Sequence, residues 1–122
     1  MKKIILIFTL VLTTAAFAQN KNAKASIEVD GVCGMCKERI EKAAVRTKGV
    51  KSAVWNVNTH ELNLIFNEGK TDLKTISKKV ASVGHDTKEI KATNEQYNAI
   101  HSCCKYRDEE VVNDHKKKDE QE

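Results

Sequence analysis

The chain has 122 residues, of which 40% are hydrophobic and 31% are charged, and its formal net charge is +4. This length is enough for one small domain with a tail but not for two domains. So small a positive surplus, with only 5% aromatic residues, gives no basis for a nucleic-acid-binding surface. The sequence contains no glycine-rich phosphate loop and no recognisable Ser-His-acid arrangement, so we expect a protein that is not an enzyme.

The first 18 residues have the pattern of a secretory signal peptide. Lys2 and Lys3 precede an apolar run, and an A-x-A cleavage site ends at Ala18. The run is shorter than the roughly 20 apolar residues of a spanning helix, which disfavours an uncleaved anchor. We therefore expect a periplasmic or secreted protein that begins at Gln19 and has no stable membrane insertion after cleavage.

Residues 19–23 are expected to form a linker, and residues 24–92 a single domain. Hydrophobic periodicity predicts six elements there, in the order β-α-β-β-α-β: 24–29, 35–48, 53–57, 62–66, 73–83 and 87–92. Thr71 is a candidate N-cap of the second helix, and Trp55 is expected in the core. This order predicts an α+β, ferredoxin-like fold with a four-stranded antiparallel sheet and two helices on one face.

The C-terminal part of the chain changes in character after Ala92. Residues 93–107 are predicted to be a Cys- and His-containing tail with a short helix, capped by Asn94 and extending to Tyr106. Residues 108–122 are nearly all charged and are predicted to be disordered.

Cys33 and Cys36 form a C-x-x-C just ahead of the first predicted helix. Exposed backbone N–H groups at a helix start stabilise a thiolate, which lowers the pKa of a cysteine there. Two thiolates at a surface suit a soft ion that accepts low coordination, Cu(I) above all. A structural zinc site takes four protein ligands, and this loop supplies two.

Residues 24–92 resemble the heavy-metal-associated domain of small copper chaperones and periplasmic mercury-binding proteins. Both cysteines match, and so do Gly49-Val50 before the second strand and Val83-Gly84 before the last strand. The loop methionine of the family would fall at Gly31, and its Thr or Ser before the first cysteine is Val32. The resemblance implies a metallochaperone that carries Cu(I) or, as second choice, Hg(II), with Zn(II) and Cd(II) as further alternatives.

The resemblance also places His85, in the last loop, close to the metal, so His85 is a candidate third ligand. The implied partners are proteins that donate or accept the metal, such as a metal-transporting ATPase or a membrane transporter. We expect a monomer, with a metal-bridged dimer as the alternative. Transfer would proceed by ligand exchange, because low coordination leaves room for an incoming thiolate or thioether.

The tail motif HSCC is not covered by the resemblance, and it brings His101, Cys103 and Cys104 within four residues. These side chains are candidate ligands that either fold over the C-x-x-C or form a second site. The plainer alternatives are a disulfide from the tail to the C-x-x-C, or a thiol that links two chains.

Two other functions compete with metal binding. Cys33 and Cys36 have the spacing of a thiol–disulfide oxidoreductase, although the chain contains no proline to form the cis-proline of thioredoxin-like proteins. Alternatively, the cysteines are bridged and the domain binds a protein partner through its surface.

Overall fold

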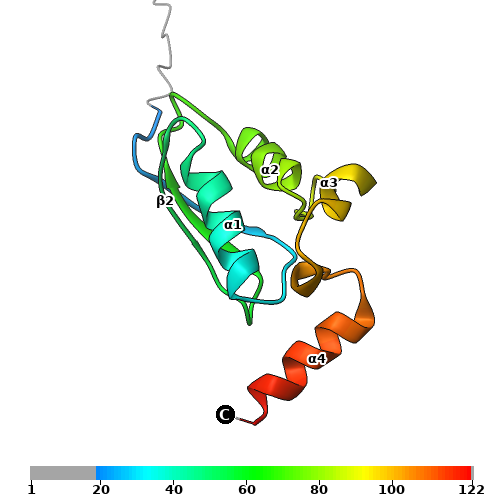
Figure 1. Ribbon diagram of the computed structural model, residues 1–122. Helices are drawn as coiled ribbons and strands as arrows, with labels where there is room; N and C mark the ends of the chain where they lie inside the picture. Colours follow the sequence, from blue (N-terminus) through cyan, green and yellow to red (C-terminus); the bar gives the residue numbers. More distant parts are fainter. Residues whose placement is uncertain (1–18, 122) are drawn as a thin grey trace, which may run out of the picture.

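The computed structural model describes residues 19–121 (Figure 1), so the predicted signal peptide lies outside the described residues. The first five elements are β1 (Ala23–Glu28), α1 (Gly34–Val45), β2 (Val50–Trp55), β3 (Glu61–Phe66) and α2 (Leu73–Ser82). The tail adds α3 (Asn94–Asn98), the 3₁₀ helix η1 (Ser102–Cys104) and α4 (Glu109–Asp119). Among these described residues, no helix has the length and apolar character that crossing a membrane requires.

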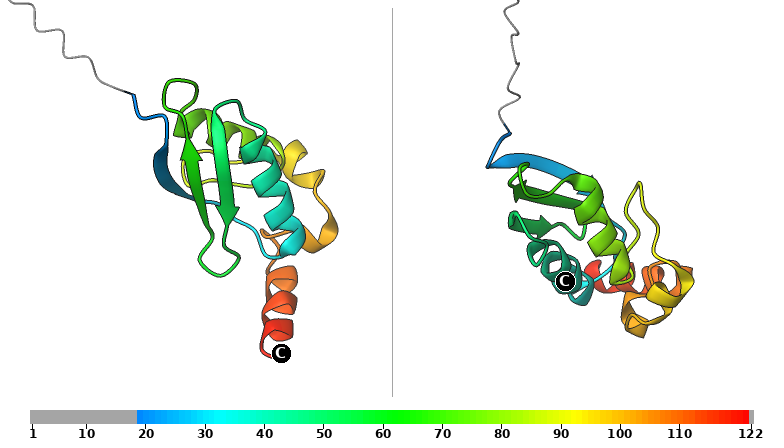
Figure 2. Two further views of the ribbon diagram at one scale, coloured as in Figure 1. Left: turned by 90° about the vertical axis from the view of Figure 1, so that its left-hand side faces the viewer. Right: turned by 90° about the horizontal axis from the view of Figure 1, so that it is seen from above.

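The sheet is antiparallel, with β3 between β1 and β2, and the predicted hairpin of β2 and β3 is confirmed. Leu64 of β3 lies opposite Ala25 of β1 and Ala53 of β2. Helices α1 and α2 lie on the same side of the sheet (Figures 1 and 2), as predicted. Between the helices and the sheet lies a core of fully buried side chains: Ile40, Trp55, Leu62, Leu64, Ile76 and Val80.

The sheet differs from the prediction, because it has three strands in the described part of the chain instead of four. The segment predicted as the last strand, Thr87–Ala92, contributes a single isolated bridge, between Thr87 and Val29. The Thr87 hydroxyl donates to the Ile90 carbonyl oxygen at 3.0 Å and accepts from the Ile90 backbone N–H at 3.0 Å. These bonds close a turn that takes the place of further ladder bonds to β1.

Two helix N-caps lie one residue from their predicted positions. Asp72, not Thr71, caps α2, and its carboxylate accepts from the Thr75 backbone N–H at 2.7 Å. Thr93, not Asn94, caps α3, in a capping box with Gln96. In both cases the neighbouring residue also has a side chain that caps helices well, so residue type alone did not identify the cap.

The tail is more structured than its composition indicates. The helix predicted from Asn94 to Tyr106 is divided into α3 and η1, with His101 at the start of η1. The charged segment predicted as disordered contains α4, whose N-cap is Asp108. Acidic residues occupy the first turn of α4 and lysines the last turn, an order that complements the helix dipole.

Candidate metal centre

The C-x-x-C lies where β1 leads into α1. Cys33 is the N-cap residue of α1, and Cys36 lies in its first turn and is fully buried. The two Sγ atoms are 3.4 Å apart, and the Val32 backbone N–H donates to Cys36 Sγ at 3.5 Å. Both sulfur atoms are therefore close enough to bind one ion, as the sequence spacing predicts.

Trp55 supports this loop from below. Its indole Nε1–H donates to the Val29 carbonyl oxygen at 3.0 Å, and the ring is 1% exposed. A Cβ atom at Gly31 would lie 2.9 Å from Trp55 Cη2 and 3.0 Å from Cys36 Cβ. The indole thus occupies the space beside position 31, the position at which the family's loop methionine would fall. A larger residue at position 31 would collide with it.

The tail cysteines lie against the C-x-x-C. Cys104 is fully buried, and its Sγ is 3.5 Å from Cys33 Sγ and 3.7 Å from Cys103 Sγ. The Sγ atoms of Cys33, Cys103 and Cys104 all lie within 4.8 Å of one another, and all four cysteines are free. The Cys103 thiol contacts Met35 Sδ at 3.4 Å. The fold therefore brings together two cysteine pairs that are about 70 residues apart in sequence.

The four thiols have different acidities. Burial raises the pKa of Cys33, but the Cys36 backbone N–H and the thiols of Cys36 and Cys104 outweigh burial, and the net pKa is lowered. Burial raises the pKa of Cys36, that of Cys103 to about 11 and that of Cys104 to about 12. Cys33 is thus the thiol that ionises first in the metal-free protein.

The candidate ligand His101 lies at the edge of this sulfur cluster. Its Nδ1 is 3.2 Å from Cys103 Sγ and also accepts from the Cys103 backbone N–H at 3.3 Å. Met35 was not a predicted site residue, although its position between Cys33 and Cys36 in the loop could have indicated a contact. Its side chain is 46% exposed, so the Cys103–Met35 side of the cluster is the side nearest to solvent.

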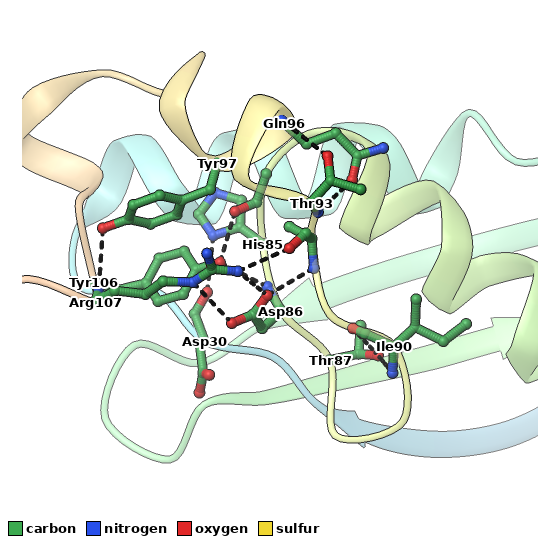
Figure 3. A network of polar contacts seen from close by, with 12 residues as sticks. Asp30, His85, Asp86, Thr87, Ile90, Thr93, Gln96, Tyr97, Tyr106 and Arg107 are labelled. Carbon is green, nitrogen blue, oxygen red and sulfur yellow. Dashed lines mark hydrogen bonds and ion pairs between the residues drawn. The ribbon is translucent and has the colours of Figure 1, made fainter.

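His85 is buried beside the loop. Its ring nitrogens, like Cys36 Sγ, are not in the group of ligand atoms of Cys33, Cys103 and Cys104 that lie within 4.8 Å of one another. Its Nδ1 is 2.8 Å from the Asp30 carbonyl oxygen, and its ring stacks on Tyr106 with centroids 5.4 Å apart (Figure 3). The Asp30 carbonyl can only accept, so Nδ1 carries the proton of the neutral ring. The buried Nε2 has no hydrogen-bond partner among the described residues.

The burial of His85 predicts a pH-dependent stability. Burial lowers its pKa to about 4, from an ordinary value of 6.5. Below about pH 6.5 the unfolded chain binds a proton that the folded chain does not bind until about pH 4, so stability falls as the pH falls through this window. Between about pH 7.5 and pH 5, the free energy of unfolding should fall by about 2 kcal/mol.

Urea unfolding of the reduced, metal-free protein at several pH values measures this effect. The His85→Gln variant is the matched control, because glutamine can still donate to the Asp30 carbonyl oxygen but does not titrate. The other ionisable groups near the ring, Asp86, Tyr106 and Arg39, are unchanged in it. An equal loss of stability in both proteins would contradict the assignment to His85.

The tail segment just before α4 is hydrogen-bonded to the loop between α2 and the Thr87 turn (Figure 3). The Tyr106 hydroxyl donates to the Gly84 carbonyl oxygen at 2.7 Å and accepts from the Asp86 backbone N–H at 2.9 Å. The Arg107 guanidinium donates to Asp86 Oδ1 at 2.8 Å and to the Ala92 carbonyl oxygen at 2.9 Å. We call these contacts of Tyr106 and Arg107 the tail anchor; no sequence motif indicated them.

The structure is a small α+β domain with a pair of thiols at the start of its first helix. The profile of the heavy-metal-associated domain matches residues 26–86, half of the chain, and the chain belongs to this family. The tail that carries Cys103 and Cys104 lies outside the matched range. The chain is thus a metal-binding domain of this family with an additional cysteine-containing segment.

Three known proteins show the extent of the similarity. A copper-exporting P-type ATPase of Staphylococcus haemolyticus (strain JCSC1435) is 32% identical over 84 residues, which are 64% of this chain but 11% of that relative. The CopZ metallochaperone structure superposes with a TM-score of 0.52 at 24% identity, covering 53% of this chain and 98% of that one. Oxidized MerP from Ralstonia metallidurans CH34 gives 0.52 at 22% identity, covering 54% and 93%. The two structural similarities establish the fold.

Proposed function

We propose that the protein is an exported, non-enzymatic metallochaperone that binds Cu(I) through Cys33 and Cys36 and passes it to a partner by ligand exchange. The observation that carries the proposal is the 3.4 Å separation of the two Sγ atoms at the start of α1. Thiolates are soft ligands, and a pair of them suits a soft ion of low coordination number. Each thiol that binds the ion releases its proton to solvent, and no electron is transferred.

Copper is the preferred cargo because the similar P-type ATPase is named for copper export. Hg(II) is the alternative, since two thiolates bind it as well. A metal-transporting ATPase or another membrane transporter is the proposed partner. Export rests on the signal-peptide pattern of the first 18 residues. Elemental analysis of protein isolated without oxygen from the periplasm or medium tests the metal and the location together.

A Cu(I) titration against a chromophoric chelator tests the site itself. The chain from Gln19 onward, which contains every described element, should bind one Cu(I) tightly when reduced. The Cys33→Ser/Cys36→Ser variant should lose tight binding, since it has no thiolate at α1. The matched control is Cys103→Ser/Cys104→Ser, which removes the same number of thiols and should keep one-to-one binding.

Tight binding that survives the first variant and disappears in the second would overturn the proposal. The proposal would also be overturned if neither the unaltered chain nor either variant competed with the chelator for Cu(I). An insulin-reduction assay on the same samples addresses the oxidoreductase alternative, and turnover that depends on Cys33 and Cys36 would favour that alternative.

A further inference from the structure

Cys104 is fully buried in the core, and its thiol lies against that of Cys33. Its Sγ is 3.5 Å from Cys33 Sγ, and Cys33 Sγ is in turn 3.4 Å from Cys36 Sγ. A tetrahedral or trigonal ion with metal–sulfur bonds of about 2.3 Å needs sulfur atoms roughly 3.8 to 4.0 Å apart. The two distances to Cys33, 3.4 Å and 3.5 Å, require only small adjustments to reach that spacing.

We propose that the tail completes the metal site, with Cys104 as a third thiolate ligand to the ion bound by Cys33 and Cys36. This inference rests on the proposed function and extends it to a segment outside the matched family range. Cys103 lies on the solvent side of Cys104, against Met35 Sδ. It is therefore the first thiol that an entering ion meets and the last that a leaving ion contacts. Binding releases one proton from each of the three thiols, and the oxidation state of the ion does not change.

A third thiolate on the ion needs a cation close to it. Three thiolates around Cu(I) carry a net charge of −2, which is costly in a buried place without a nearby cation. The Arg39 side chain is the cation that acts on the Cys104 thiol. Arg39 Nη1 is buried and has no hydrogen-bond partner among the described residues. A thiolate at Cys104 would supply the acceptor that this N–H group lacks.

The tail anchor holds Cys104 in place before any metal arrives. Tyr106 and Arg107, two and three residues after Cys104, are bound to Gly84, Asp86 and Ala92 of the domain. On the other side, His115 Nε2 of α4 is 2.9 Å from the Cys103 carbonyl oxygen. Since the backbone around Cys104 is fixed by bonds that do not involve sulfur, the third ligand is preorganised, and its contribution to affinity is not lost to ordering.

X-ray absorption at the copper edge, in buffer free of small thiols, counts the sulfur ligands of the one-to-one Cu(I) complex. We expect three in the unaltered chain and in Cys103→Ser, and two in Cys104→Ser. The same variant should bind Cu(I) at least about tenfold more weakly in the chelator titration, as expected when a fixed ligand is removed. Cys104→Ala is a second variant, because a serine hydroxyl in this buried place carries its own folding cost.

Tyr106→Phe tests the role of the tail anchor without changing a thiol. It removes both hydrogen bonds of the phenol and should weaken Cu(I) binding by a smaller factor than Cys104→Ser. Two sulfur ligands in the unaltered chain would overturn the inference while leaving the two-cysteine function intact. Loss of the third sulfur in Cys103→Ser but not in Cys104→Ser would overturn the choice of Cys104. Tight binding in Cys33→Ser/Cys36→Ser would instead contradict the proposed function.

Discussion

Replacement of Trp55 with alanine should lower the free energy of unfolding by about 4 kcal/mol, the range for a large buried aromatic side chain. Trp55 is 1% exposed and lies in the core beneath the C-x-x-C loop. Its Nε1–H bond to the Val29 carbonyl oxygen would also be lost, which leaves that buried carbonyl without this donor. Equilibrium unfolding in urea of the reduced, metal-free protein measures the change.

Val54→Thr is the matched control, since Val54 is the preceding residue of β2 and is 52% exposed. It keeps a β-branched side chain and should change stability by less than about 0.5 kcal/mol. Adding Gly31→Met to Trp55→Ala should restore about 1 kcal/mol or more, because a flexible thioether can fill the space beside the loop. No recovery in the double variant would contradict the view that Trp55 occupies the space of a loop methionine.

Replacement of Gly84 with alanine should cost about 3 kcal/mol. Gly84 has φ +100°, a conformation that costs an L-residue about 1 to 2 kcal/mol. The new Cβ would also overlap Ile100 Cγ2 and lie 2.8 Å from the Gln96 carbonyl oxygen, so the tail would be forced away from α2. Thermal unfolding of the metal-free protein reports the loss, and Cu(I) titration reports whether the tail still reaches the thiols.

Gly34→Ala supplies the comparison for this variant. Gly34 opens α1, and a Cβ there would meet nothing within 4 Å. Alanine is the better helix former, so this variant should be as stable as the unaltered chain or up to about 1 kcal/mol more stable. Equal losses in the two variants would show that the cost at Gly84 does not come from its backbone conformation or its contact with Ile100.

The parts of the fold that depend on local periodicity could be predicted from sequence. Alternation in β3 and helical spacing in α2 identified both elements, because each buries one regular face. Whether Thr87–Ala92 forms a fourth strand depends on a competition between ladder bonds to β1 and local side-chain bonds, which periodicity does not report. There the Thr87 hydroxyl bonds to Ile90 and closes a turn after a single bridge to β1.

The candidate site also has one part that could be predicted from sequence and one part that could not. Cys33 and Cys36 could be identified from their spacing and their place before a helix, since the chemistry is local. That Cys104 lies against Cys33 depends on the tail anchor, which joins residues about 20 positions apart through a phenol and a guanidinium. A tyrosine and an arginine in a polar segment carry no pattern that indicates such partners.

The tail anchor also sets which motion can open the site. Among the described residues, its hydrogen bonds and ion pair all lead to Gly84, Asp86 and Ala92, and none leads to the three strands. Their release would free the tail while the sheet and α1 stay intact, a subglobal opening of lower free energy than complete unfolding. On the proposed function, a recipient that competes for the Gly84–Asp86 loop would then control release of the ion. In hydrogen-exchange terms, the amides of residues 99–107 should lose protection as one unit before those of β3.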